Sequence, residues 1–556
     1  MFNKNLESID NQALKRRLAK ISPEESRIGI SYCVTPTNDY VLLKDDLPAD
    51  DLQNPREAIK LMLKSNIKQE MKSTDIIIAF GMGLGYLIDE LYNSYSSKIY
   101  LYEPDLNLLH FVLSNVDMSE ILASGRVFLT NDLDELISKL SSTYITKDRV
   151  EIVYLPNYAM VKNKELLILT QKVFDSCKSK MIDINTITRF SKEWLANTID
   201  NITYINKNKV YLLSDLESKF IGQTALIAGA GPSLADNIEN IKQNRNKFVI
   251  FSVNKSTSYL VQNGIIPDFV VCLDAANMDR TLSGSEELFN KINAIVDIRT
   301  DKSIMKKGFH KIFVNFSETD FFIKKLAKYN SFMKFYESGG TASTMAFVSA
   351  IKMGFSKIVL AGIDLAFKDN VIYSYGETMN RVSQDEIVVD NIPKNLVQVK
   401  SVKGEMVYTR DDYQAFITHF ETLIKELNYK EVYNLTSFGA LIEGVKNIKF
   451  SELNLNTNSH IQPVAFVEPF TFNIQEFIQE EFCAINDIIR ALSSGIFSTA
   501  LVSKVIKSVL IYQYMQADIL IVLQKNFDTE LAQSFMENTK QAIKNVVEKL
   551  KDNKLI

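Results

Sequence analysis

Residues 224–254 read TALIAGAGPSLADNIENIKQNRNKFVIFSVN, and the rest of the chain is organised around them. An apolar run breaks at the first turn, Gly229-Ala230-Gly231-Pro232-Ser233, and a helical pattern follows. The first N–H groups of a helix lack partners and the helix dipole favours negative charge, so this turn suits an anion. Glycine lets a phosphate come close, and Ser233 offers a helix cap or a hydroxyl. The stretch predicts a nucleotide-binding turn.

Short apolar strands alternate with helical segments from residue 224 to about residue 364. This alternation predicts a parallel sheet with helices on both of its faces. Polar residues end three of the strands, at Asn254, Asp274 and Asp364. Ligands of open α/β sheets bind at the carboxyl ends of the strands, so we expect these side chains to share a rim with the first turn.

A second turn of small residues, Ser338-Gly339-Gly340-Thr341-Ala342-Ser343, precedes another helical pattern that Gly354 closes. Its glycines and hydroxyls lie at a helix N-terminus, where they are available to anionic oxygens. Two such turns facing one cleft would hold a nucleotide and a charged substituent. The alternative is a tight turn that only caps its own helix.

A related pattern lies upstream, where residues 75–105 read DIIIAFGMGLGYLIDELYNSYSSKIYLYEPD. The order is strand, a turn of the form Gly81-x-Gly83-x-Gly85, helix, and a second strand ending in Glu103. Eighteen residues separate Gly85 from Glu103, the distance at which a Rossmann-like unit places an acid against a ribose. The glycine spacing is closer to methyltransferase-like folds than to NAD binders. We predict a Rossmann-like unit here, whose turn either binds a ligand or is structural.

The pattern divides the chain into four predicted domains. Residues 1–70 combine helical and β-like stretches in an N-terminal α+β module, and 71–205 form a Rossmann-like domain with a helical connector. Residues 206–455 form the central α/β domain. Residues 456–556 become amphipathic helix after about residue 470, so they predict a C-terminal helical domain.

Composition narrows the function classes. The 556 residues carry a formal net charge of −4, with 46% hydrophobic and 23% charged residues, so no global basic field recruits nucleic acid. The cysteines (Cys33, Cys177, Cys272 and Cys483) are scattered, which argues against a zinc cluster or a disulfide framework and fits a reducing cytoplasm.

The most apolar C-terminal window, 509–523, is shorter than a membrane span. We expect a cytoplasmic protein without a membrane span.

Several of these motifs together resemble those of the motility accessory factors, which are flagellin glycosyltransferases. The resemblance rests on Ala228-Gly229-Ala230-Gly231-Pro232-Ser233-Leu234, Asn254, Ser338-Gly339-Gly340-Thr341-Ala342 and Ala361-Gly362-Ile363-Asp364-Leu365-Ala366. It extends to FGMGLG and EPD upstream and to YNLTSFGALIEG downstream. The strand–GPSL–helix plan is also similar to that of the small bacterial sialyltransferases.

The resemblance implies a fold and an activity. The fold is α/β, with a central Rossmann-like, GT-A-type, sialyltransferase-like domain, preceded by a second Rossmann-like α/β domain and followed by a helical domain. The activity is cytoplasmic transfer of a nonulosonic acid, such as pseudaminic or legionaminic acid, from its CMP-activated donor to Ser or Thr of flagellin. Flagellin is then the protein partner and the nucleotide sugar the donor substrate, with no tightly bound cofactor; a homo-oligomer is left open.

The residues expected to bind the donor nucleotide lie on both turns and at one strand end. They are Gly229, Gly231, Pro232, Ser233, Asn254, Ser338, Gly339, Gly340 and Thr341. In the sialyltransferases that the chain resembles, the asparagine matching Asn254 contacts the nucleotide sugar, and the turn matching 338–341 lies near nucleotide and sugar. Because leaving CMP develops phosphate charge, backbone donors at these turns would stabilise the transition state more than the ground state.

The proton acceptor is not identified by motif. The sialyltransferases use a histidine, but His110, His310, His419 and His460 all lie outside the 338–364 motif region. Asp274 and Asp364 are the candidates for the base or for sugar positioning, and each is equally compatible with a turn or helix-capping aspartate. The central domain contains no obvious aspartate-x-aspartate motif, so we predict no essential protein-bound metal.

Two other functions are compatible with the same residues. A related GPSL-containing group resembles pterin pyrophosphokinases, which handle ATP. A flagellin-binding accessory protein would retain the nucleotide-type fold without turnover.

Overall fold

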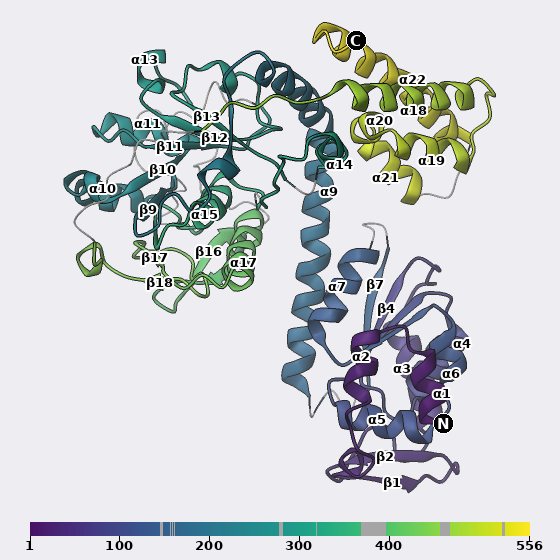
Figure 1. Ribbon diagram of the computed structural model, residues 1–556. Coiled ribbons are helices and arrows are strands. Elements are labelled where there is room, and N and C mark those ends of the chain that lie inside the picture. The colour runs from purple at the N-terminus through teal and green to yellow at the C-terminus, as the bar shows by residue number, and fades with distance from the viewer. Residues whose placement is uncertain are drawn as a thin grey trace. The chain divides into compact units, whose positions relative to one another are not determined.

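The computed structural model describes residues 1–144, 148–155, 157, 160, 162–276, 282–317, 320–337, 339–367, 396–455, 467–524 and 529–556. The chain divides into two compact units, Met1–Asn185 and Thr186–Ile556. The long helix α9 (Asn163–Ile205) contains the boundary between them. Figure 1 labels the elements of each unit.

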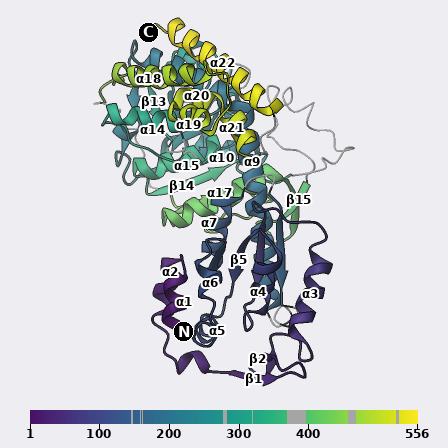
Figure 2. The ribbon, with the colours of Figure 1, turned by 90° about the vertical axis from the view of Figure 1, so that its right-hand side faces the viewer.

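The first unit is built on a four-stranded parallel sheet in the order β6-β5-β4-β7. Its strands are β4 (Ile76–Phe80), β5 (Lys98–Tyr102), β6 (Val127–Thr130) and β7 (Val150–Tyr154). All five residues of β4 are buried, because its sequence IIIAF is apolar on both faces, as in a strand covered by helices on both sides. Helix α7 lies on one side of this sheet, with α3 and α4 on the other (Figures 1 and 2).

The helices of the first unit connect and flank these strands. They are α1 (Phe2–Ser8), α2 (Gln12–Leu18), α3 (Pro55–Asn66), α4 (Tyr86–Ser94), α5 (Leu106–Asn115), α6 (Ser119–Ala123) and α7 (Leu133–Thr143), with a 3-10 turn η1 (Glu25–Arg27). Helix α3 begins where its sequence dictates, because Pro55 needs no N–H partner at the first position and the Asn54 side chain accepts the N–H of Glu57.

A small antiparallel sheet precedes the four-stranded one. It consists of β1 (Ile30–Val34), β2 (Tyr40–Lys44) and β3 (Leu47–Pro48). Leu14, Leu42 and Ile59 belong to the same buried apolar cluster as the strands of the four-stranded sheet. Residues 1–70 therefore share a core with the segment that follows them.

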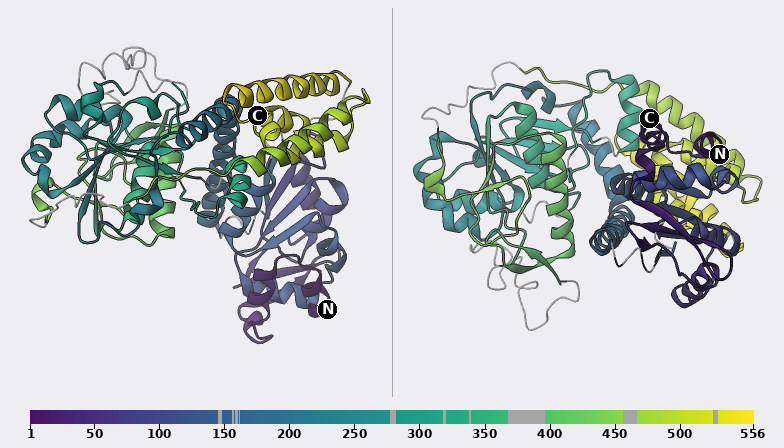
Figure 3. Two further views of the ribbon diagram at one scale, coloured as in Figure 1. Left: turned by 45° about the horizontal axis from the view of Figure 1, so that its top comes forward. Right: turned by 90° about the horizontal axis from the view of Figure 1, so that it is seen from below.

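The second unit is built on a nine-stranded parallel sheet in the order β18-β17-β14-β9-β10-β11-β12-β13-β8. Its strands are β8 (Tyr211–Leu212), β9 (Thr224–Ala228), β10 (Val249–Val253), β11 (Phe269–Cys272), β12 (Asn293–Asp297), β13 (Ile312–Asn315), β14 (Lys357–Ala361), β17 (Val432–Asn434) and β18 (Lys446–Asn447). A separate antiparallel hairpin is formed by β15 (Leu396–Lys400) and β16 (Met406–Arg410). Figure 3 shows the nine-stranded sheet with helices on both of its faces.

The helices of the second unit that cover this sheet are α10 (Ser233–Gln243), α11 (Asn254–Gln262), α13 (Glu286–Phe289), α14 (Phe321–Leu326), α15 (Ala342–Met353) and α17 (Asp411–Glu426). Short 3-10 turns accompany them at η2 (Leu213–Leu216), η3 (Arg245–Lys247), η4 (Ile304–Lys306), η5 (Ala327–Tyr329) and η6 (Phe450–Glu452).

The order of the strands reverses once, between β9 and β14. From β9 the chain adds β10, β11, β12 and β13 in succession on one side, and β14 then pairs with β9 on its other side. The loops after β9 and β14 leave the same sheet edge in this region, which is the topological switch point where open α/β sheets bind ligands.

The C-terminal helices of the second unit pack against one another and against α14 (Figure 1). They are α18 (Gln475–Leu492), α19 (Thr499–Lys507), α20 (Val509–Tyr514), α21 (Gln516–Gln524) and α22 (Thr529–Asp552). Phe477 and Ile511 belong to one buried cluster with Val296 of β12 and Ile202 of α9. The helices thus share a core with one face of the sheet, and the predicted domain boundaries at residues 70, 205 and 455 remain predictions.

The apolar window 509–523 is divided between two short helices, α20 and α21, with Met515 between them. Within the described ranges, none of the helices is long and apolar enough to cross a membrane.

Candidate functional site

The predicted site residues lie at the carboxyl edge of the nine-stranded sheet. The first turn (229–233) follows β9, Asn254 follows β10, and Asp274 lies two residues after β11. Asp364 follows β14, and the second turn leads into α15. Ser338 of that turn lies outside the described residues.

The first turn is locked to the loop after β14 by close backbone contact. The Gly229 N–H donates to the Ala361 oxygen at 2.8 Å, and the Gly231 N–H donates to the Gly362 oxygen at 2.7 Å. A Cβ atom on Gly229 would lie 2.3 Å from the Gly362 oxygen. Glycine is required here because only a residue without a side chain allows two backbones to approach so closely.

The N-terminus of α10 is capped by Asp364. Its Oδ2 accepts the Ser233 N–H at 2.9 Å, while the Ser233 hydroxyl accepts the Gly362 N–H at 3.1 Å. Asp364 is 2% exposed, and burial raises the pKa of its carboxyl, against hydrogen bonds from Ser233 and Thr436. A carboxylate of the chain therefore occupies the position that an anion would take at this helix N-terminus.

This geometry changes what the first turn offers a ligand. Three of its N–H groups, at Gly229, Gly231 and Ser233, already have acceptors within the chain. The hydroxyl of Ser233 does not cap α10 and instead ties the turn to Gly362. The first turn shapes the floor of the sheet edge, and a phosphate would compete with Asp364 for its amides.

The second turn is built differently. Gly339 and Gly340 have φ angles of 68° and 75°, in the left-handed region that favours glycine. Thr341 caps α15, because its hydroxyl accepts the Thr344 N–H at 3.1 Å while the Thr344 hydroxyl accepts the Thr341 N–H at 3.1 Å. Within the described residues, no acceptor is recorded for the N–H groups of the first two residues of α15, which follow the cap. This helix start remains available to an anion.

A histidine that the motifs did not identify lies against the second turn. His419 comes from α17, and its Nε2 atom lies 2.6 Å from the position that a Cβ atom on Gly339 would take. The Thr344 hydroxyl lies at the same distance from that position. The only sequence signal was a lone histidine beside the buried face of an amphipathic helix, which is too weak to select it.

Asn254 and Asp274 are in direct contact. The Asn254 amide donates to Asp274 Oδ2 at 3.2 Å, and Asn254 is 4% exposed as the first residue of α11. The Asp274 side chain is exposed, yet the surrounding protein removes enough water to raise the pKa of its carboxyl, against the charge of Lys255 and the bond from Asn254. The carboxyl of Asp274 is therefore accessible to solvent, and the buried amide of Asn254 holds it in place.

A buried ion pair lies at the end of β12, the strand next to the one that precedes Asp274. Arg299 donates from Nε and Nη2 to the two oxygens of Asp297, at 2.8 and 3.0 Å, and its guanidinium lies over the Trp194 ring. The Asn197 amide donates to the Ala275 oxygen at 2.8 Å. Trp194 therefore stacks on a charged group at the sheet edge, and α9 fixes the loop after β11.

Within the parts of the chain that the structure describes, no group of three or more His, Cys, Asp or Glu side chains is placed to hold a metal ion. The expectation that activity needs no protein-bound metal stays a prediction.

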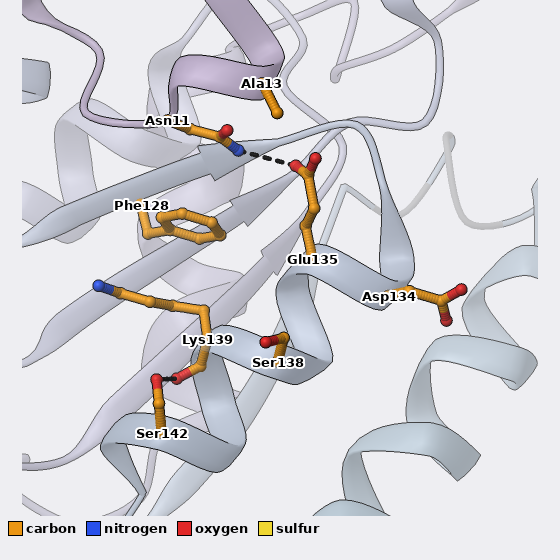
Figure 4. A pocket seen from close by; sticks show the side chains of 8 residues that line it. All are labelled: Asn11, Ala13, Phe128, Asp134, Glu135, Ser138, Lys139 and Ser142. Carbon is orange, nitrogen blue, oxygen red and sulfur yellow. Dashed lines mark hydrogen bonds between the residues drawn. The ribbon is translucent and has the colours of Figure 1, made fainter. Parts of the chain in front are cut away.

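The first unit contains a shallow groove of about 530 Å³ beside α7, shown in Figure 4. On its wall, Glu135 accepts hydrogen bonds from Asn11 at 2.8 Å and from both nitrogens of the Arg17 fork. The bonds from Arg17 lower the pKa of Glu135 to about 2, so its carboxylate is already neutralised within the chain. None of the predicted site residues lines this groove.

Three comparisons bear on the class of the protein. A family model described as 6-hydroxymethylpterin diphosphokinase MptE-like matches residues 196–370. An uncharacterized protein of Treponema pallidum (strain Nichols) is 29% identical over 168 residues, which cover 29% of this chain and 77% of that protein. The solved structure of the MAf glycosyltransferase from Magnetospirillum magneticum AMB-1 matches 98% of this chain and 94% of its own, with a TM-score of 0.64 and 16% identity.

These comparisons define the fold. The predicted α/β class is confirmed: the chain has two Rossmann-like parallel sheets and a helical C-terminal region, and its fold is similar to that of the MAf glycosyltransferase. The likeness to the MAf glycosyltransferase is one of fold, since only 16% of the aligned residues are identical.

Proposed function

We propose that the protein is a cytoplasmic glycosyltransferase that transfers a nonulosonic acid, of pseudaminic or legionaminic type, from its CMP-activated donor to Ser or Thr of flagellin. Two observations carry the proposal: Asn254 contacts Asp274 beyond the ends of β10 and β11, and His419 lies against the second turn, which leads into α15. The fold of the MAf glycosyltransferase, matched over 98% of the chain, supports the same reaction class.

The donor phosphate is assigned to the start of α15. No described residue accepts the N–H groups of the two residues after Thr341, and these groups would meet the charge that develops on departing CMP. Asn254 orients the sugar or the nucleotide through its amide. The first turn, including Pro232, contributes shape, because its own amides are used by the loop after β14.

The proton acceptor for the attacking hydroxyl is assigned to His419 or Asp274. A base must lie within hydrogen-bond reach of the acceptor hydroxyl, and both residues lie on the edge where the donor is expected. Asp364, predicted as a second catalytic candidate, is buried and caps α10, so we assign it to positioning the first turn.

Intact mass measurement of flagellin tests the proposal. Purified protein is incubated with flagellin and CMP-pseudaminic or CMP-legionaminic acid, and we expect flagellin to gain the mass of the sugar while CMP is released. If flagellin binds the protein but gains no mass with either donor, the accessory, non-catalytic role is favoured instead.

A second candidate is an ATP-dependent, pterin pyrophosphokinase-like activity. The MptE-like family model supports it, because the matched residues, 196–370, include both turns and the strand ends at Asn254, Asp274 and Asp364. Calorimetric titration with CMP and with ATP separates the two functions. Tight binding of ATP with no binding of CMP would refute sialyl-type transfer.

A further inference from the structure

A groove of about 590 Å³ lies in the second unit between α14 and α18, where the start of α20 closes one end. It is separate in sequence from the turns and strand ends of the candidate site. Its wall carries a mixture of lysines, acids and one exposed aromatic ring.

The acids of this groove are already paired within the chain. Lys325 Nζ lies 2.9 Å from Glu480 and 2.7 Å from the buried Glu481. The Tyr329 hydroxyl also donates to Glu480. Asp487 lies 3.6 Å from Arg490, one turn along the same helix. Three acids thus face two cations, because Lys325 is shared between Glu480 and Glu481.

Three other lysines line the groove. Lys324, Lys328 and Lys507 are exposed, and in the described part of the chain none of them forms an ion pair. Lys324 lies in the last turn of α14, Lys328 lies four residues on in η5, and Lys507 ends α19. The lining carries four lysines against two acids, Glu480 and Asp487, so the groove has a net positive charge although the whole chain has a net charge of −4.

An apolar anchor point lies at the same groove. The Phe321 side chain is 51% exposed although it packs edge-on against Tyr512, with ring centroids 5.2 Å apart. Aromatic residues are enriched at surfaces that contact another protein, so Phe321 is the apolar contact point of this groove.

We infer that this groove docks an acidic segment of the polypeptide acceptor, with its carboxylates toward the three lysines and an apolar side chain against Phe321. The inference rests on the proposed function only in naming the partner as the acceptor. Charge complementarity selects an acidic segment, and the ring selects a polypeptide that carries an apolar side chain among its acids.

Fluorescence anisotropy tests the docking by itself. The probe is a short labelled polyglutamate peptide with one central phenylalanine, titrated with the full-length protein at low and physiological salt. We expect saturable binding that weakens with salt, and roughly a tenfold loss in the variant K324E/K328E/K507E, because charge pairs at an interface are screened by ions. The matched control is K544E/K551E/K554E, which makes the same charge change on exposed lysines of α22 and its C-terminal end.

Phe321→Ala sharpens the assignment. This variant should bind the phenylalanine-containing peptide more weakly than the wild type does, and its affinity for an all-glutamate peptide should be unchanged. Equal losses in the groove variant and in the control would overturn the inference, as would tighter binding of a single-stranded oligonucleotide than of the peptide.

The transfer assay then connects the groove to function. The K324E/K328E/K507E variant should raise the KM for flagellin several-fold, with unchanged CMP affinity and an unchanged rate of donor hydrolysis in the absence of flagellin. If the wild-type protein transfers no sugar, the proposed function fails while the peptide titration still decides the docking site. If transfer occurs with an unchanged KM in the variant, the groove is not the acceptor site.

Discussion

The two glycine turns of the molecule, 81–85 in the first unit and 229–233 in the second, start from the same plan and end differently. Each follows the strand of a Rossmann-like parallel sheet at which the strand order reverses, β4 in the first unit and β9 in the second. Each also has a buried aspartate packed against one of its glycines: Asp50 against Gly83 and Asp364 against Gly231, where a Cβ atom would lie 2.6 and 2.4 Å from the carboxylate.

The two turns differ in the side chains that surround them. At Gly83, the side chain of Leu155 lies 3.0 Å from the Cβ position, and Met118 packs against Gly85. The acid predicted for a ribose, Glu103, is fully buried and accepts the N–H groups of Met82 and Asp105, each at 2.9 Å. The first unit thus fills its ligand position with its own side chains.

The second unit keeps polar and accessible groups beside its turn. Asp274 is exposed, and His419 and Thr341 lie at the neighbouring second turn. A glycine turn after a buried strand therefore does not indicate a ligand by itself. The side chains that arrive from other elements decide whether the place is filled or open.

The largest expected effect separates the two candidate bases of the open turn. His419→Gln should lower the transfer rate by about 10²–10⁴-fold while CMP affinity stays within a few-fold, because only proton transfer is lost. Asp274→Asn should cost about tenfold or less through its contact with Asn254. Steady-state CMP release in the presence of flagellin measures both. The reverse ranking would assign the base to Asp274, and two fully active variants would remove the reaction from this sheet edge.

Substituting one glycine in each turn sharpens the comparison. Gly231→Val should weaken CMP binding by distorting the turn, and it should lower the free energy of unfolding by roughly 1–3 kcal/mol, since its Cβ would lie 2.4 Å from Asp364 Oδ2 and 2.8 Å from the Gly362 backbone oxygen. Gly83→Val should destabilise the first unit through Asp50 and Leu155 but leave CMP affinity unchanged. Calorimetry and denaturant unfolding give the two readouts. Unchanged CMP affinity in Gly231→Val would exclude the first turn from the site.

The filled turn should show itself in the pH dependence of stability. Burial raises the pKa of Asp50 to about 7, against the N–H of Leu84, and its Oδ2 has no hydrogen-bond partner within the described residues. The folded state therefore holds a proton that the unfolded chain releases near pH 4. The contribution of this proton to the free energy of unfolding is complete below pH 4. As the pH rises from 4 toward 7, the free energy of unfolding falls by about 4 kcal/mol at most.

Asp50→Asn tests that pH window. It should remove this pH dependence and be more stable than the wild type at pH 8, while the two proteins are similar at pH 4. Denaturant unfolding across pH 4–8, followed by a probe in the first unit, is the measurement. Parallel curves for the two proteins would show that Asp50 ionises in the folded state without cost.

The smallest effect is expected at the equivalent aspartate of the second turn. Asp364→Asn retains an oxygen that accepts the Ser233 N–H, so transfer should stay within a few-fold and stability should fall by about 1 kcal/mol. Activity and unfolding are measured on the same preparation. A loss of transfer of about a hundredfold with intact CMP binding would restore Asp364 as a catalytic residue.

Local patterns predicted the elements well because they depend on near neighbours in the chain. The alternation of apolar strands with helices implied parallel sheets, and both sheets are parallel throughout. Asn54 and Pro55 begin α3, and Gly354 ends α15 with a left-handed φ of 88°. The strand ends predicted that Asn254 and Asp274 would lie on one rim of the sheet, and the structure adds that the two side chains are in contact.

The roles of single residues were predicted less well. Glu103 fits the spacing of a ribose-binding acid, yet it holds its own loop. No motif selected His419, because a histidine on a later helix has no fixed spacing to the turn that it contacts.

The sequence by itself determined where strands, turns and helices begin, because periodicity, glycine and capping residues act over a few positions. Only the tertiary structure decided what each glycine turn contacts. The Ser233 N–H meets a carboxylate 131 residues away, and a bond over that separation depends on how strands are ordered in the sheet. Strand order reverses in both units, at the place where open α/β sheets bind ligands. In the first unit, side chains from other elements fill that place. In the second unit, polar side chains there remain accessible.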